Sequence, residues 1–231
     1  MSIYQYFCGY NAKRKRLYKK APTNSALKDF LAVPFPEPKT LFSQVPLLAV
    51  DFETTGLHAV NDKLLSVGYV GMQNNQIQLG QSYHQVINTQ QRLKTDNVLI
   101  HHITDHQQAQ GQPLETVIES LLQALAGKVM LVHFARIERQ FLQQACLEVY
   151  GLAPVFPIID TLVVAKRRLD KRDIAYDPSE LRLANLRQKY HLPNHFAHNA
   201  LNDAIATAEL LLAQIHHHEN VEKLTLRNLL C

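Results

Sequence analysis

The chain has 231 residues, 46% of them hydrophobic, and a formal net charge of +4. This length and apolar content are enough for one large domain with a buried core. The three cysteines, Cys8, Cys146 and Cys231, are an odd number without metal-type spacing, which argues against a disulfide framework and favours a reducing compartment. Because no apolar run reaches the roughly 18 residues of a membrane span and no secretory signal is visible, we expect a cytoplasmic protein.

The first 40 residues are strongly basic. They hold eight Lys or Arg residues against Asp29 and Glu37, a net charge of +6, so the remainder carries −2. Six of these cations lie between residues 13 and 20, and four prolines follow between 34 and 46. Such a tract either neutralises phosphates of a nucleic acid or forms a solvated helix face or flexible leader. We predict an arm and proline-rich linker over 1–45, the main domain over 46–217 and a C-terminal tail over 218–231.

Residues 47–57, LLAVDFETTGL, form the most informative segment. The run is short, branched and apolar between Pro46 and Gly56, which predicts a buried strand. Side chains alternate along a strand, so Asp51 and Glu53 lie on one face and Phe52 on the other. Two adjacent buried carboxylates repel each other and are costly to desolvate. A divalent cation such as Mg²⁺ or Mn²⁺ removes both problems, so this strand predicts a metal site.

The rest of the chain alternates between strand-like and helix-like patterns. Predicted strands cover residues 63–72, 76–87, 128–132 and a short run that ends at 159. Predicted helices cover residues 113–127, 135–150, 181–190 and 199–217, and a further helix begins at Thr161 with Asp160 as its cap. The order of these elements predicts an α/β domain around one mixed sheet.

Glu138 is an anomaly within the helix predicted at 135–150. It lies on or beside the apolar stripe that includes Phe141, Leu142 and Ala145, where a carboxylate is rare unless it is paired or bound to metal. One interpretation is an edge glutamate paired with a neighbouring arginine, Arg136 or Arg139. The other is a functional carboxylate.

Asp203 and His198 lie at the start of the last predicted helix of the main domain, which is apolar almost all round. An acid in the first turn is also stabilised by the helix dipole, so Asp203 has a structural explanation too. Together, however, the two residues provide a metal ligand and a base suited to activating water near neutral pH.

These motifs in combination resemble the DnaQ-like (DEDDh) 3′–5′ exonucleases of the ribonuclease H-like superfamily. The motifs are DFETTG with Asp51 and Glu53, HFARIERQFL with Glu138, and HNALNDA with His198 and Asp203. The resemblance covers about residues 46–215. It implies a ribonuclease H-like fold, with a central mixed five-stranded sheet flanked by helices. It also implies hydrolysis of phosphodiester bonds at single-stranded DNA or RNA 3′ ends, and a DNA polymerase or repair complex as partner.

The resemblance also implies roles for individual residues. Two divalent ions, Mg²⁺ or Mn²⁺, would be held by the acids, with Asp51, Glu53 and Asp203 as direct ligands. His198 would deprotonate the attacking water. The turn formed by Thr54, Thr55, Gly56 and Leu57 would hold the terminal nucleotide. His101 resembles a histidine near that nucleotide, although a plain loop role fits it equally well.

The middle motif departs from the family pattern, because aspartate usually stands where this chain has Glu138. The extra methylene moves the carboxylate by about 1.5 Å, and misplacing a catalytic group by ~1 Å can cost about a hundredfold in rate. We expect an active enzyme in which glutamate replaces a carboxylate and a water. The alternative is a catalytically weakened module that binds nucleic acid or serves a polymerase.

Overall fold

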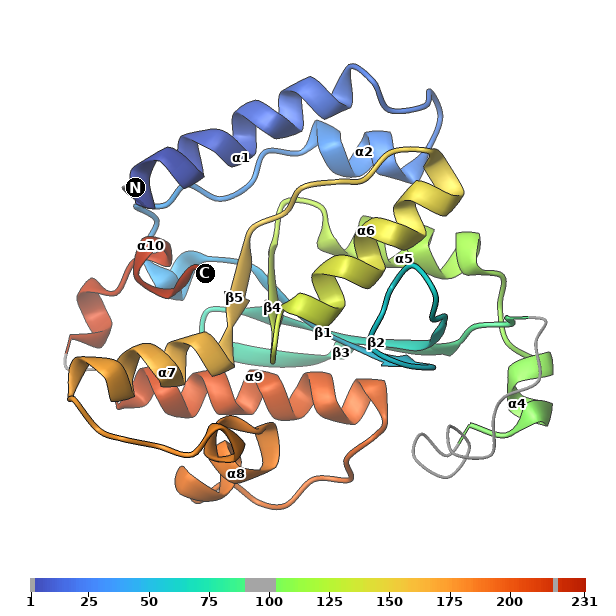
Figure 1. The fold of residues 1–231 in the computed structure, drawn as a ribbon. Helices are drawn as coiled ribbons and strands as arrows, with labels where there is room; N and C mark the ends of the chain where they lie inside the picture. The colour runs from blue at the N-terminus through green and yellow to red at the C-terminus, as the bar shows by residue number, and fades with distance from the viewer. Residues whose placement is uncertain (1–2, 90–102, 218–219) are drawn as a thin grey trace.

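The structure, a computed structural model, describes residues 3–89, 103–217 and 220–231. Five strands form one mixed sheet in the order β3-β2-β1-β4-β5 (Figure 1). Their bounds are β1 (Leu47–Thr54), β2 (Leu64–Gln73), β3 (Gln76–Val86), β4 (Val129–Val132) and β5 (Ile158–Asp160). β1, β2 and β3 are antiparallel, whereas β4 and β5 run parallel to β1. The predicted fold class is therefore confirmed.

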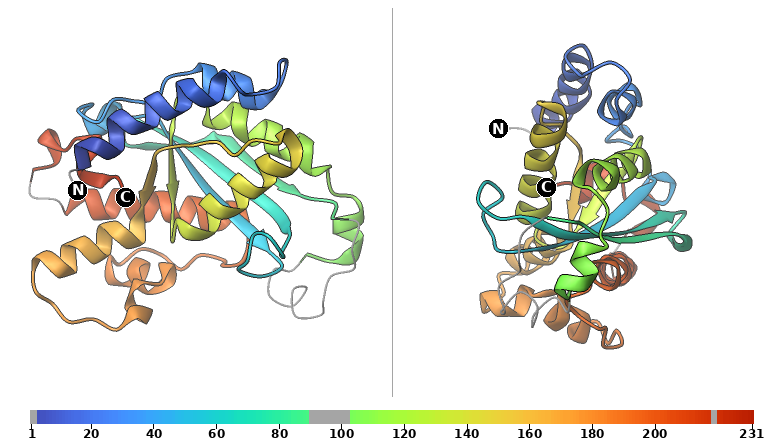
Figure 2. Two further views of the ribbon diagram at one scale, coloured as in Figure 1. Left: turned by 45° about the horizontal axis from the view of Figure 1, so that its top comes forward. Right: turned by 90° about the vertical axis from the view of Figure 1, so that its right-hand side faces the viewer.

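Helices cover both faces of this sheet (Figure 2). On one side lie α5 (Leu114–Leu125) and α6 (Arg136–Tyr150), and on the other lies α9 (Ala200–His216). The remaining elements are α4 (Asp105–Ala109), α7 (Thr161–Lys171), η2 (Pro178–Leu181), α8 (Leu183–Lys189) and η3 (Val221–Lys223). No helix within the described parts of the chain is both long and apolar enough to span a lipid bilayer.

Strand β1 divides its side chains between the two sides of the sheet. Val50 and Phe52 join the hydrophobic core that contains α5 and α6. Leu47 and Ala49 instead join the core formed with α9. Since side chains alternate along a strand, Asp51 and Glu53 continue the second series and face α9. The predicted separation of Phe52 from the two acids is confirmed.

The N-terminal segment packs into the domain, which differs from the prediction of a solvated or flexible leader. It forms α1 (Ile3–Tyr18), α2 (Ala26–Ala32) and η1 (Phe42–Gln44). Leu27, Phe30 and Leu31 of α2 are buried in the same core as α5 and α6. The apolar pattern of α2 and the hydrophobic effect outweigh the high charge of the preceding tract.

The C-terminal segment is also packed, because α10 (Leu226–Leu229) buries Leu226 and Leu229 in the core beneath α9. The division of the chain at residues 45 and 217 stays a prediction. Both outer segments nevertheless share the cores of the main domain, so hydrophobic contacts cross each boundary.

Candidate active site

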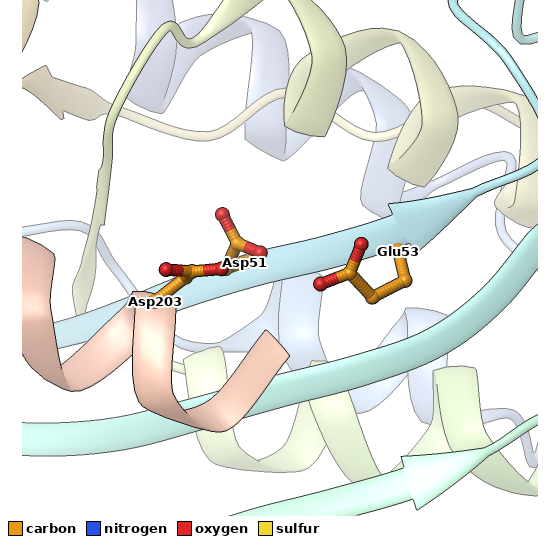
Figure 3. A group of neighbouring side chains, drawn as sticks. All are labelled: Asp51, Glu53 and Asp203. Carbon is orange, nitrogen blue, oxygen red and sulfur yellow. The ribbon is translucent and has the colours of Figure 1, made fainter. Parts of the chain in front are cut away.

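Asp51, Glu53 and Asp203 form a cluster at the junction of β1 and α9 (Figure 3). One carboxylate oxygen from each side chain lies within 4.8 Å of the other two. Asp51 and Glu53 come from one face of β1, and Asp203 comes from the first turn of α9. Three carboxylates at this spacing offer hard oxygen ligands, so the group can hold a divalent metal ion.

A glycine on the neighbouring strand allows α9 to reach β1. Gly68 of β2 pairs with Asp51 across the sheet. A Cβ atom at Gly68 would lie 2.2 Å from the backbone carbon of Ala200 and from the nitrogen of Leu201. Only a residue without a side chain fits beneath this helix end. The close backbone approach therefore brings the first turn of α9, with Asp203, over the strand that carries Asp51.

Burial and mutual repulsion disfavour the charged forms of these acids. The pKa of Asp51 is raised well above its ordinary value, first by burial and then by the charges of Glu138, Asp203 and Glu53. Burial also raises the pKa of Asp203, although His195 opposes the shift. A bound cation would reverse this effect, because it favours the ionised carboxylates.

Glu138 lies in the first turn of α6, and only 3% of its surface is exposed. Its Oε2 atom has no hydrogen-bond partner among the residues that the structure describes. Burial raises its pKa to about 8. The predicted alternative of an arginine pair is wrong within the described residues: no ion pair reaches Glu138, and the Arg139 Nη2 atom lies 3.8 Å from Cys231 Sγ. An orphaned buried oxygen beside Asp51 fits a site that receives a cation.

Glu138→Gln should stabilise the metal-free protein at alkaline pH but not at acidic pH. The folded-state pKa of Glu138, about 8, lies above its ordinary 4.5. Its stabilising contribution is therefore complete below the lower value and is lost as pH rises through the higher one. At about pH 8 we expect the variant to be more stable by on the order of 1–3 kcal/mol, which raises Tm by roughly 2–10 °C. Thermal melts in EDTA check this result. A Tm difference that does not grow between about pH 5 and pH 8 would contradict it.

Asp160 fixes the turn that leads into α6. Its side chain caps α7 by accepting a hydrogen bond from the Leu162 amide at 2.9 Å, as predicted. It also accepts from the amides of Phe134 at 3.0 Å and Ala135 at 2.8 Å. Phe134 has a left-handed φ of 71°, which is strained for an aromatic residue. The buried carboxylate of Asp160 thus holds a strained turn four residues before Glu138, which the cap prediction alone did not anticipate.

A second histidine, His195, contacts Asp203 directly. Its Nε2 atom lies 2.9 Å from Asp203 Oδ1. The predicted base, His198, has an exposed side chain, and its backbone amide donates to Asp203 Oδ2 at 2.8 Å. Sequence reasoning missed His195, because its position eight residues before Asp203 matches no helical or strand spacing. The loop before α9 brings the two together.

The turn after β1 is held by its own side chains. Thr54 Oγ1 donates to the Gly56 carbonyl at 2.7 Å, and Thr55 Oγ1 lies 3.2 Å from Asp62 Oδ1. Leu57 at the tip is 65% exposed. The turn predicted to hold a nucleotide is therefore pre-shaped and presents an apolar side chain to solvent. His101, the other predicted contact, lies outside the described residues.

Comparison with known proteins places these residues in a family context. The Exonuclease (RNase_T) family model matches residues 48–211, well over half of the chain. A DNA polymerase III PolC-type protein of Thermotoga petrophila is 30% identical over 171 residues, which are 74% of this chain and 12% of that protein. A DNA polymerase III subunit epsilon of Treponema pallidum is 27% identical over 175 residues, 75% of this chain and 78% of that protein. The chain thus spans a small part of the PolC-type relative and most of the epsilon relative.

Solved structures share the fold. The nuclease domain of 3′hExo, a DEDDh family member bound to rAMP, has a TM-score of 0.63 and 14% identity, covering 75% of this chain and 92% of that one. The zinc-bound E. coli ExoI–ssDNA complex has a TM-score of 0.65 and 15% identity, covering 77% of this chain and 42% of that one. Both likenesses extend over β1, α6 and α9, the elements that carry the acids, only in the sense that the folds agree.

Proposed function

The chain belongs to the Exonuclease (RNase_T) family, as its motifs predicted, and we propose that it is a metal-dependent 3′–5′ exonuclease. Its substrates are single-stranded DNA or RNA 3′ ends, from which it releases nucleoside monophosphates. The observation that carries this proposal is the cluster of Asp51, Glu53 and Asp203, whose ligand atoms lie within 4.8 Å of one another.

The donor set suits Mg²⁺ or Mn²⁺. Asp51, Glu53 and Asp203 offer hard oxygen ligands, and the unpartnered Oε2 of Glu138 offers another at the edge of the group. When two ions are bound, they orient the attacking water and stabilise charge on the phosphate and the leaving oxygen. The carboxylates hold the ions, and their burial keeps competing water away.

His198 and the turn after β1 complete the proposed chemistry. His198 takes the proton from the water that attacks the terminal phosphorus, and the 3′-oxygen of the preceding nucleotide leaves. Its exposed side chain is accessible to a substrate, and its backbone amide ties it to Asp203. Thr54, Thr55, Gly56 and Leu57 hold the terminal nucleotide, with the exposed Leu57 side chain against the base. His101 is proposed as a further contact.

The experiment that tests this function follows 5′-labelled DNA and RNA oligonucleotides with Mg²⁺, with Mn²⁺ and with EDTA. We expect a ladder of products shortened one nucleotide at a time from the 3′ end, and nucleoside monophosphates among them. A 3′-phosphorylated oligonucleotide and a circular one serve as controls. Cleavage of the circle would indicate an endonuclease. Intact substrates across both metals and both nucleic acids would overturn the proposal.

The alternative function is a nucleic-acid-binding or polymerase-accessory module without effective catalysis. The single observation that favours it is Glu138, which stands where the family usually has aspartate. This module would bind an oligonucleotide but leave it intact with either metal. In both cases we propose a DNA polymerase or repair complex as partner, since relatives are named DNA polymerase III proteins. We also propose a cytoplasmic location, which suits the free thiols of Cys146 and Cys231.

The basic face of α1 is expected to contact the nucleic acid away from the acids. Arg14 turns inward and donates to the Leu31 carbonyl and to Asn11 Oδ1, which fixes α1 to α2. Five other cations of this tract are exposed: Lys13, Lys15, Arg16, Lys19 and Lys20. Because the helix is packed against the core, these charges are held in place and can meet phosphates with little ordering cost.

A salt titration tests this face. We expect the triple variant K15Q/R16Q/K19Q to bind single-stranded DNA more weakly in EDTA. Its plot of log affinity against log salt should be shallower by up to about 2, because each lost phosphate contact on a single strand removes ~0.7. The control K171Q/R172Q/K223Q removes three exposed cations elsewhere. Equal slopes for the two triple variants would show that α1 is only a solvated surface.

A further inference from the structure

Two groups from one loop hold the carboxylate of Asp203. His195 Nε2 lies 2.9 Å from Oδ1, and the His198 amide donates to Oδ2 at 2.8 Å. The His195 and Asp203 side chains are only 12% and 13% exposed, so solvent competes weakly for this contact. We propose that His195 is a positioning residue that orients Asp203 for metal binding. This inference rests on the metal site of the proposed function.

The chemistry of the pair supports this role. An ionised carboxylate only accepts hydrogen bonds, so the contact requires the proton on His195 Nε2. Each carboxylate oxygen has two lone pairs, and the histidine uses one of those on Oδ1. Another lone pair on the carboxylate then points in a fixed direction and is available to a cation. Outer hydrogen bonds of this kind orient metal-binding side chains, and their loss typically weakens metal affinity 10- to 100-fold.

Two amide donors could not do this work alone. The His198 amide is the only backbone donor to Asp203 in the printed contacts of the described loop, and it restrains one oxygen. A carboxylate held at one oxygen can still rotate about its Cβ–Cγ bond. The second contact, from His195, removes that rotation. Without it, Oδ1 would also lose a partner in a half-buried position, which is unfavourable.

The two histidines can be separated by substitution. Replacing the His198 side chain leaves the backbone amide and its bond to Asp203 in place. Replacing His195 removes one of the two contacts that orient Asp203 while leaving the proposed base. A merely structural role for His195, closing the loop between α8 and α9, would change stability without changing metal affinity.

The test measures Mn²⁺ binding to the full chain by the loss of the free-ion EPR signal, with thermal melts of each variant. We expect His195→Ala and His195→Phe to weaken Mn²⁺ binding 10- to 100-fold. Phe keeps the ring and carries the test if Ala does not fold. His195→Gln, which restores a donor at similar reach, should return affinity to within about threefold of wild type. His198→Ala should leave Mn²⁺ affinity unchanged while shortening of oligonucleotides slows.

The outcomes separate this inference from the proposed function. Wild-type Mn²⁺ affinity in both His195→Ala and His195→Phe would overturn the inference, whatever the nuclease activity. A failure of Gln to restore the affinity lost in Phe would also overturn it. A wild-type protein that binds Mn²⁺ through His195 but never shortens an oligonucleotide would overturn the exonuclease and leave the inference standing.

Discussion

Asp203→Asn and Asp51→Asn are each expected to reduce 3′-end hydrolysis by on the order of a thousandfold or more, equivalent to about 4 kcal/mol of transition-state stabilisation. Each change keeps the size of the side chain but replaces a charged ligand oxygen with an amide group. The three acids converge on one point within 4.8 Å, so the loss of either one leaves an incomplete ligand set. Single-turnover rates at saturating Mn²⁺ provide the measurement.

Folding and charge are controlled separately. Asp29→Asn, on the exposed face of α2, makes the same chemical change away from the cluster and should keep wild-type activity. The metal-free Asp51→Asn protein should melt no lower than wild type near neutral pH, because burial and neighbouring acids raise the pKa of Asp51. Retention of more than about a tenth of the activity in both cluster variants would contradict the assignment of the metal site.

Glu138 is expected to give the second largest effect, and its two substitutions should differ. Glu138→Gln should lose about a hundredfold or more in rate, because the charge is removed from a position whose field already raises the pKa of Asp51. Glu138→Asp should stay within about tenfold of wild type, since the charge remains and a water can span the ~1.5 Å that is lost. Both rates are measured with the same oligonucleotide over a range of Mn²⁺ concentrations.

The direction of the aspartate variant decides between the two functions. A rate increase of tenfold or more in Glu138→Asp would show that the natural glutamate impairs catalysis and would favour the accessory module. Equal activity of Glu138→Gln and wild type would show that this carboxylate has no part in the reaction. The buried stem of Glu138 makes a passive role a poor explanation, because an unpaired buried acid costs stability.

The acids on β1 were predictable, because a strand has a fixed two-residue period and both its ends are marked in the sequence. The face shared by Asp51 and Glu53 follows from that period alone. The burial of Glu138 was predicted equally well from helical spacing. Its arginine pair was predicted wrongly, because spacing along a helix cannot say whether a side chain turns toward its neighbours or toward another element.

Contacts that depend on tertiary approach were not predictable. His195 reaches Asp203 through an irregular loop without a repeat that sequence analysis can use. Arg14 belongs to a tract that looks uniformly solvated, yet it alone turns inward, because α2 packs beside it. Asp160 was identified as a cap, but its bonds to the Phe134 and Ala135 amides require that β4 and β5 be neighbours. The site residues retain their assigned roles as proposals.

Gly68 has a consequence for how variants of this protein are interpreted. It carries no functional group and belongs to a strand that supplies none of the acids, so a change there would ordinarily be classed as a fold mutation. A methyl group at this position would nevertheless force the end of α9 outward and carry Asp203 away from Asp51. The tolerance of the site is therefore set by backbone separation as well as by acid identity. A protein in which every acid is intact can lose the site through one strand residue.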